Sequence, residues 1–224
     1  MNTPRTRIIF GVIALVASCA WLNPLFCDDS GDIIFSDDFK NGIKEDNWRI
    51  NARDCEVSAT NGRIHIHGTI NDGTDKSFRC STKNRLPADN FTASVKFRVP
   101  QFSGTGMRMI VLEANPAESE TFGLFYKHET GYRVGWWGKP TKISSSRKPF
   151  RDEDETFHKM KLIYDAEKQK LTGYVDRRKV GTLRDITISG DIRYSLVIQR
   201  VAASTKPPSE VDIYFDDFEV RTFP

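Results

Sequence analysis

The sequence has few features that would support nucleic-acid binding, and it lacks the common short signatures of catalysis. Its 33 lysines and arginines nearly balance 30 aspartates and glutamates. Arg5 and Arg7 are the only charged residues among the first 18, so the rest of the chain carries a net charge of +1, which gives no support to a nucleic-acid partner. No Gly-x-Ser-x-Gly elbow indicates a serine nucleophile, and no Cys-x-x-Cys pair indicates zinc.

Helical periodicity is also missing, because no segment of ten or more residues repeats its apolar positions at the spacing of a helix. Instead, about a dozen short alternating segments are separated by turn residues, as in all-β proteins. The stretch Phe157–Leu183 is the clearest: Met160, Leu162 and Tyr164 alternate with lysines, and two charged turns separate two further strands. This pattern predicts a β-meander.

Two other patterns set the fold class. In Phe91–Val99, apolar residues occupy every second position, which predicts a half-buried strand. Asn61-Gly62 lies between two alternating segments and predicts a tight hairpin. We therefore predict an all-β, two-sheet antiparallel β-sandwich of the jelly-roll type over residues 31–224, one domain preceded by a targeting segment in residues 1–30.

That first segment has the composition of a signal peptide or anchor, since Arg5 and Arg7 precede the apolar stretch Ile8–Ala17. Three outcomes are open: acylation of Cys19 as in a lipoprotein, simple cleavage near the same position, or retention of Ile8–Phe26 as an anchor. Each predicts an extracytoplasmic location, in the cell envelope, in the periplasm or secreted, with membrane contact only through the anchor or lipid.

An oxidising compartment would allow a disulfide between Cys55 and Cys80, which lie in neighbouring strand-like segments. Cys27 would then remain unpaired. The alternative is that Cys55 and Cys80 are unpaired buried thiols.

Three segments resemble the concanavalin A-like lectin and glucanase superfamily, which includes the laminin-G-like domains. They are IIFSDDFKNG followed by Trp48, the meander LIYDAEKQKLTGYVDRRKVG, and the closing VDIYFDDFEV. The resemblance covers Asp32–Arg221 and implies a sandwich in which the last strand lies beside the first. It also implies a structural calcium ion, with Asp217 as the most similar ligand position and Asp38 as its neighbour, since hard cations prefer oxygen ligands. The alternative is two solvated acidic strand ends.

The glucanases of this superfamily carry a Glu-x-Asp-x-x-Glu pattern, which places an acid and a nucleophile about 5 Å apart. The sequence is interpreted as lacking that pattern, because Asn115 and Pro116 are expected to break the strand between Glu113 and the later acids Glu118 and Glu120. A glucanase-type hydrolase is therefore not expected, although another hydrolase branch of the same fold remains open.

Aromatic residues gather in the hairpin formed by Thr121–Lys127 and Tyr132–Trp137. Neighbouring residues of a strand face opposite sides, so Trp136 and Trp137 cannot both be buried. Sugars stack on aromatic rings and accept hydrogen bonds from charged side chains. We therefore predict a ligand-binding face; the alternative is that both tryptophans cover core edges. The predicted face comprises Trp137, Arg133, Arg108 and Tyr126.

His65 and His67 share one strand face, but with no third ligand nearby they are interpreted as an ordinary exposed face. The combined prediction is a non-catalytic module that binds a carbohydrate or surface polymer outside the cytoplasm, tethered to the envelope. The alternatives are a glycoside hydrolase on the same fold and a structural or protein-interaction module.

Overall fold

Fifteen strands and no helix make up the part of the chain that the structure describes. In this computed structural model the described residues are 31–70, 76–87, 89–104, 107–117, 120–127, 131–137, 142–145, 155–201 and 208–224. Cys19 and the rest of the predicted targeting segment lie outside them. None of the described residues belongs to a helix long and apolar enough to cross a membrane.

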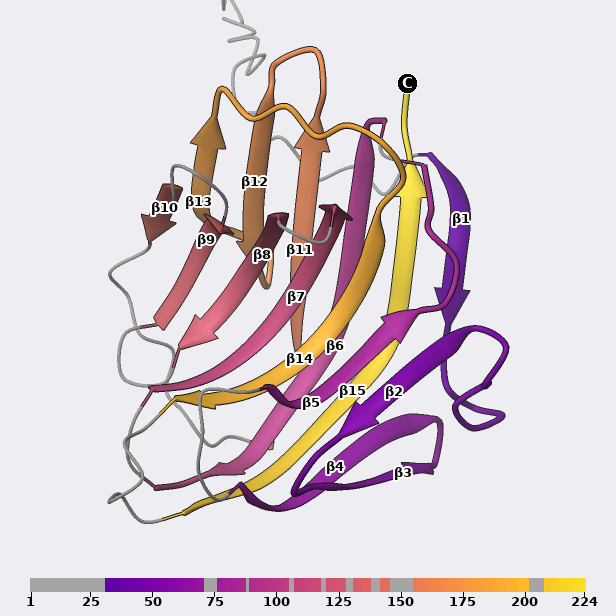
Figure 1. Ribbon diagram of the computed structural model, residues 1–224, viewed down its shortest axis with the longest axis vertical. Helices are drawn as coiled ribbons and strands as arrows, with labels where there is room; N and C mark the ends of the chain where they lie inside the picture. Colours follow the sequence, from indigo (N-terminus) through magenta and orange to yellow (C-terminus); the bar gives the residue numbers. More distant parts are fainter. Residues whose placement is uncertain are drawn as a thin grey trace, which may run out of the picture.

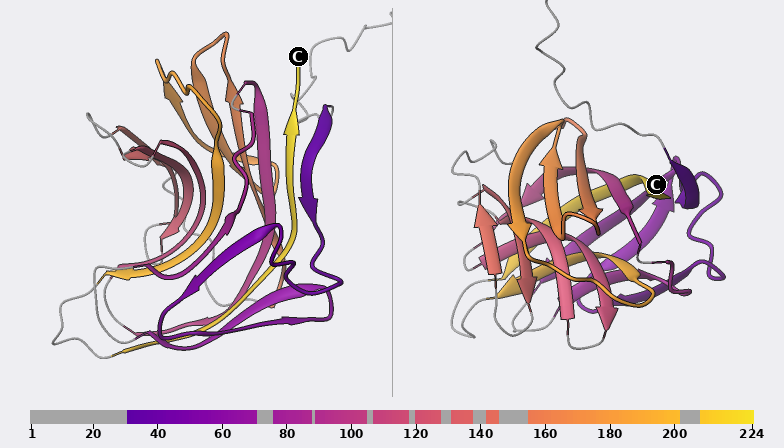
Figure 2. Two further views of the ribbon diagram at one scale, coloured as in Figure 1. Left: turned by 45° about the vertical axis from the view of Figure 1, so that its right-hand side comes forward. Right: turned by 90° about the horizontal axis from the view of Figure 1, so that it is seen from above.

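The strands form two antiparallel sheets that face each other, as predicted (Figures 1 and 2). The eight-stranded sheet contains, in order, β13 (Arg178–Arg184), β12 (Lys170–Val175), β11 (His158–Asp165), β6 (Phe91–Phe102), β15 (Ser209–Thr222), β4 (Arg63–Ile70) and β3 (Glu56–Thr60), with β1 (Asp32–Asp37) paired to β15. The seven-stranded sheet contains β10 (Lys142–Ser145), β9 (Gly131–Trp137), β8 (Glu120–Lys127), β7 (Met107–Ala117), β14 (Arg193–Val201), β5 (Lys76–Thr82) and β2 (Trp48–Ala52).

The predicted meander is confirmed as β11, β12 and β13, and β11 continues the sheet by pairing with β6. Its last strand begins at Arg178, because the turn before it has only two residues, Asp176 and Arg177, with φ angles of 47° and 66°. The predicted hairpin between β3 and β4 is confirmed as well, with positive φ at both Asn61 and Gly62, as a type I′ turn requires.

The first and last strands lie side by side, since β1 pairs with β15 from Asp32 to Asp37. Trp48 joins them to β2: its ring centroid lies 5.3 Å from that of Phe35 and 5.1 Å from that of Phe218. The indole Nε1 donates a 2.9 Å hydrogen bond to Oδ2 of Asp37. A buried carboxylate therefore stabilises this edge by accepting the indole hydrogen at the rim of the core.

The core between the sheets is continuous and apolar, and it leaves no space for extra atoms at Gly173. This residue, on β12, faces β8 and β9 across the sandwich. A Cβ atom at Gly173 would overlap Cγ2 of Val134 and would lie 3.0 Å from Cδ1 of Leu124. The side chains of the facing sheet therefore fill the space that a side chain at this position would need.

Gly173→Ala is expected to lower the free energy of unfolding by about 1–3 kcal/mol, because the added methyl group overpacks the core. Chemical denaturation followed by intrinsic tryptophan fluorescence measures the change. In the double variant Gly173→Ala/Val134→Ala the space vacated by Val134 accommodates the new methyl group, so the two changes should cost less together than the sum of the single changes. Strict additivity would contradict this packing account.

Candidate functional site

The outer face of the seven-stranded sheet is where polar side chains come together. Along β7, Ile110, Leu112 and Ala114 are fully buried in the core between the sheets. Because side chains alternate along a strand, Val111 and Glu113 face the opposite side. Figure 2 shows that the sheet curves so that this outer side is concave. We call it the concave face.

Glu113 lies in the middle of the concave face and is only 3% exposed. Nη2 of Arg79, on β5, lies 2.7 Å from its Oε2 atom. Burial raises the pKa of Glu113 above its ordinary value, and the positive charge of Arg79, together with hydrogen bonds from Asn115 and Arg79, opposes that rise. A carboxylate with two opposed influences on its protonation is typical of functional sites.

A hydrogen-bonded network surrounds this carboxylate. The side-chain amide of Asn115 lies 3.4 Å from Oε2 of Glu113 and also 3.4 Å from the hydroxyl of Ser195. Thr121, on β8, donates a 2.8 Å hydrogen bond to Oδ1 of Asn115. Ser81 lies 2.9 Å from Ser195. Four neighbouring strands thus hold Glu113 and Asn115 in fixed orientations.

The strand that carries them does not break at Asn115 and Pro116, so that expectation from the sequence is wrong. β7 continues to Ala117, and its pairing with β8 shifts between Ala114 and Ala117. Ala114 pairs with Phe122 and Ala117 with Glu120, so an advance of three residues on β7 matches an advance of two on β8. This is a β-bulge with one extra residue. Nη1 of Arg85 stabilises it by donating to the carbonyl oxygens of Asn115 at 3.1 Å and Pro116 at 2.7 Å.

An apolar patch lies beside the carboxylate on the same concave face. Val111, Phe125 and Val197 form a small buried cluster, and Met109 packs against it. The four residues come from three adjacent strands, β14, β7 and β8. The concave face therefore has a buried apolar cluster next to a charged network.

The structure places one of the four residues of the predicted ligand-binding face on the concave face and two on the core side. Arg133 lies on the concave face, directly opposite Phe125, and is half-buried. Arg108 and Tyr126 do not join it, since both are buried on the core side: Arg108 donates to the carbonyl oxygen of Phe102, and the Tyr126 ring packs 5.1 Å from that of Tyr132. The backbone of Trp137 pairs with Thr121, but its side chain lies outside the described part of the chain.

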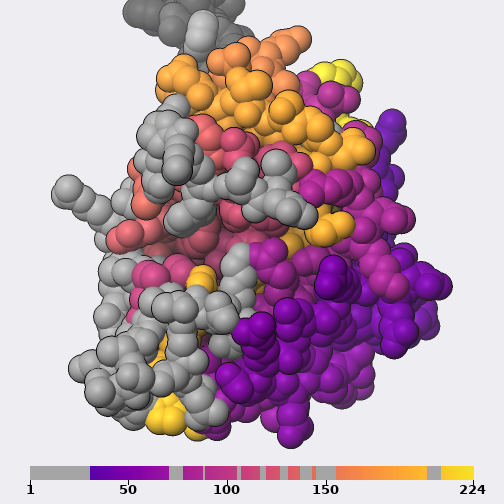
Figure 3. Space-filling view, viewed as in Figure 1, coloured from indigo at the N-terminus to yellow at the C-terminus, as the bar shows by residue number. Residues whose placement is uncertain are grey.

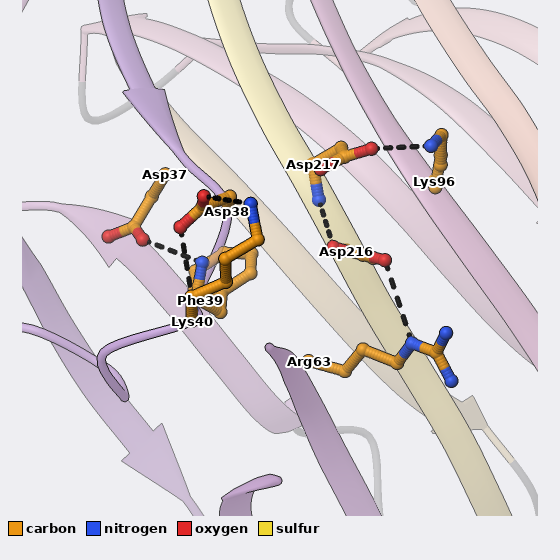
Figure 4. A network of polar contacts seen from close by, with 8 residues as sticks. All are labelled: Asp37, Asp38, Phe39, Lys40, Arg63, Lys96, Asp216 and Asp217. Atoms are coloured by element: carbon orange, nitrogen blue, oxygen red, sulfur yellow. Dashed lines mark hydrogen bonds and ion pairs between the residues drawn. The ribbon is translucent and has the colours of Figure 1, made fainter. Parts of the chain in front are cut away.

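The two predicted calcium ligands each contact a lysine instead (Figure 4). Asp38 pairs with Lys40 at 2.8 Å, and Asp217 pairs with Lys96. Among the described residues, no group of three or more histidine, cysteine or acidic side chains is placed to hold a metal ion. Calcium binding stays a prediction.

The predicted disulfide is not present, because Cys55 and Cys80 are both free thiols. Cys80, on β5, is buried in the core, whereas Cys55 is half-buried and lies just before β3 of the opposite sheet. Burial raises the pKa of Cys55 to about 11 and that of Cys80 further, so neither thiol is reactive at neutral pH.

The two paired histidines lie on the outer face of the eight-stranded sheet. His65 contacts Asp212 at 2.8 Å and His67 contacts Glu56 at 3.1 Å. Their rings stack with centroids 4.7 Å apart, and the His65 ring also stacks on that of Tyr214 at 4.3 Å. These contacts account for both imidazoles as part of a partly exposed sheet surface.

No family model and no curated protein sequence matches this chain. Solved structures do, at low identity. An endo-β-1,3-glucanase from Pyrococcus furiosus aligns with a TM-score of 0.67 and 12% identity over 87% of this chain and 95% of its own. An endo-1,3-β-glucanase from Streptomyces sioyaensis gives 0.67 and 12% over 88% and 98%. The Emp47p carbohydrate recognition domain gives 0.57 and 16% over 85% and 96%.

These similarities show the fold. The chain has the jelly-roll sandwich of the concanavalin A-like lectins and glucanases, as the three sequence segments predicted.

Replacing Arg79 by Gln is expected to raise the pKa of Glu113 further, because burial would then act with less opposition. The carboxyl carbon shift of Glu113, followed by NMR during a pH titration, measures this. When the pKa of an acid is higher in the folded than in the unfolded protein, the free energy of unfolding falls as the pH rises between these two pKa values. Because that difference in pKa should be larger in Arg79→Gln, the variant should lose more stability over this pH range than the parent protein. Arg49→Gln, an exposed change on β2, is the control. A pKa for Glu113 that is unchanged or lower in Arg79→Gln would contradict this assignment.

Proposed function

We propose that this protein is a carbohydrate-active enzyme, a glycoside hydrolase that works on the concave face of the seven-stranded sheet. The observation that carries the proposal is the buried Glu113 carboxylate, which a polar network holds beside an apolar patch. The fold is shared with endo-glucanases, which supports a glycan as the substrate. The leader-like residues 1–30 support a location outside the cytoplasm.

Glu113 is assigned the role of nucleophile. A guanidinium 2.7 Å from one carboxylate oxygen stabilises the ionised form, which is the form that attacks a sugar carbon. The nearby Asn115 amide is held by Thr121 and orients the same carboxylate. Arg79 and Asn115 therefore act as positioning residues, because they act through Glu113.

Glu118 is the proposed acid, although it lies outside the described residues. From Glu113 to Glu118 the sequence has the spacing Glu-x-Asn-x-x-Glu, which differs from the glucanase pattern only in Asn115. Five residues is an odd separation, which would put the two glutamates on opposite faces of a regular strand. The one-residue bulge between Ala114 and Ala117 reverses that parity for the strand that follows it.

A second candidate function is glycan binding without hydrolysis. Asn115 favours it, because an amide stands where the glucanase pattern has a third carboxylate. An amide cannot take up or release a proton near neutral pH. The same concave face would then bind the glycan through its polar side chains, with Glu113 as a hydrogen-bond acceptor.

The test is release of reducing ends from β-1,3- and mixed-linkage glucans by the full-length protein. Glu113→Gln and Glu118→Gln are each expected to lower the rate by about 100-fold or more, because each removes a group that takes part in bond cleavage. Glu120→Gln, a change on β8 beside the bulge, is the matched control and should keep its activity.

Two further results would separate the candidate functions. Addition of azide to Glu113→Ala should restore cleavage with a glycosyl azide as the product, because azide attacks the anomeric carbon in place of the missing carboxylate while the leaving sugar departs. Binding of glycans with no hydrolysis by the parent protein would reject the enzyme and favour the second candidate. Neither binding nor hydrolysis of any glycan, neutral or charged, would reject both.

A further inference from the structure

Four arginines from four different strands share the concave face with Glu113. Arg79 is set between the core residues Phe78 and Cys80, and Arg133 lies between the core residues Tyr132 and Val134, so both side chains face outward. The pairing of the strands places two more arginines on this face: Arg193 lies opposite Asn115, and Arg49 lies opposite Ser81.

Only one of the four is neutralised by a described carboxylate. Arg79 pairs with Glu113, whereas Arg49, Arg133 and Arg193 form no ion pair with any described acidic side chain. The buried Nε atoms of Arg133 and Arg193 also lack a hydrogen-bond partner among the described residues. An unpartnered buried donor is costly unless a ligand supplies the acceptor.

The positive charge is local, since the chain beyond residue 18 carries a net charge of only +1. The arginines lie on both sides of Glu113: Arg193 is one strand away on β14, Arg49 is further out on β2, and Arg133 is two strands away on β9. From β2 to β9 there are five strand spacings of about 4.8 Å, so the arginines extend over about 24 Å. That length matches an extended polymer better than a single small molecule.

Planar guanidinium groups bind carboxylate and sulfate groups in a two-pronged geometry that a neutral hydroxyl does not match. We therefore propose that the concave face binds an anionic glycan, a polysaccharide whose sugars carry carboxylate or sulfate groups. This inference rests on the proposed function, because it names the substrate class of the same site. Figure 3 views the molecule from the side of the seven-stranded sheet.

The experiment compares affinities of the full-length protein for matched pairs of polymers. One pair is polygalacturonate and its methyl-esterified form, and the other is a sulfated galactan and its desulfated form. Each charged polymer that is a ligand should bind at least about 10-fold more tightly than its neutral partner, and the pair that responds identifies carboxylate or sulfate as the recognised group.

Arg133→Gln and Arg193→Gln should each weaken binding of the charged polymer by about 10- to 100-fold, a larger loss than the one for its neutral partner. Arg178→Gln is the matched control, because Arg178 is exposed on β13 of the other sheet and has the same charge. The control should lose less than about 2-fold.

Three outcomes would overturn the inference. Equal affinity for charged and neutral polymers, with binding or hydrolysis intact, rejects the anionic substrate and leaves the proposed function standing. Equal losses of affinity for the charged polymer in Arg178→Gln and Arg133→Gln also reject the anionic substrate. They would mean that any surface arginine attracts the polymer to the same extent. Absence of both binding and hydrolysis with every polymer, including the neutral glucans, rejects the inference and the proposed function together.

Discussion

Alternation along the strands of the seven-stranded sheet is the constraint on which the arrangement of this protein depends. One side of each strand is committed to the core, so Leu112 and Ala114 cannot contribute to chemistry, and only the residues between and beyond them can. Glu113 and Asn115 occupy those positions. The outer positions of the neighbouring strands complete the site, because Arg79 and Ser195 reach the same network from β5 and β14.

The Glu113 carboxylate is costly to bury, and its neighbours show how the fold accommodates the charge. A guanidinium at 2.7 Å and an amide at 3.4 Å replace part of the hydration that the carboxylate loses. Replacing a partner such as Arg79 would leave an uncompensated buried group. The site is therefore more sensitive to its supporting residues than its few charges suggest.

Much of the fold was predictable because its signals are local. The meander, the Asn61-Gly62 hairpin and the strand predicted at Phe91–Val99, which continues through Pro100 to Phe102, all follow from residues close together in the sequence. The site was not predictable in the same way. Arg79 and Glu113 are 34 residues apart, and the apolar run of β7 does not reveal which of its faces is the core, so Arg108 was placed on the wrong side. An extra residue in a bulge also leaves no signature, so Asn115 and Pro116 were interpreted as a break.

The hydrogen bonds of Arg85 have a consequence for the order of folding. Its guanidinium binds carbonyl oxygens of Asn115 and Pro116, 30 and 31 residues away, and of Asp191, 106 residues away. The bulge can therefore be stabilised only after chain segments distant in sequence have met, and contacts of this kind form slowly. Assembly of the network around Glu113 should lag behind formation of the local hairpins during refolding, so a partially folded population would have the secondary structure of the sandwich before this network has formed.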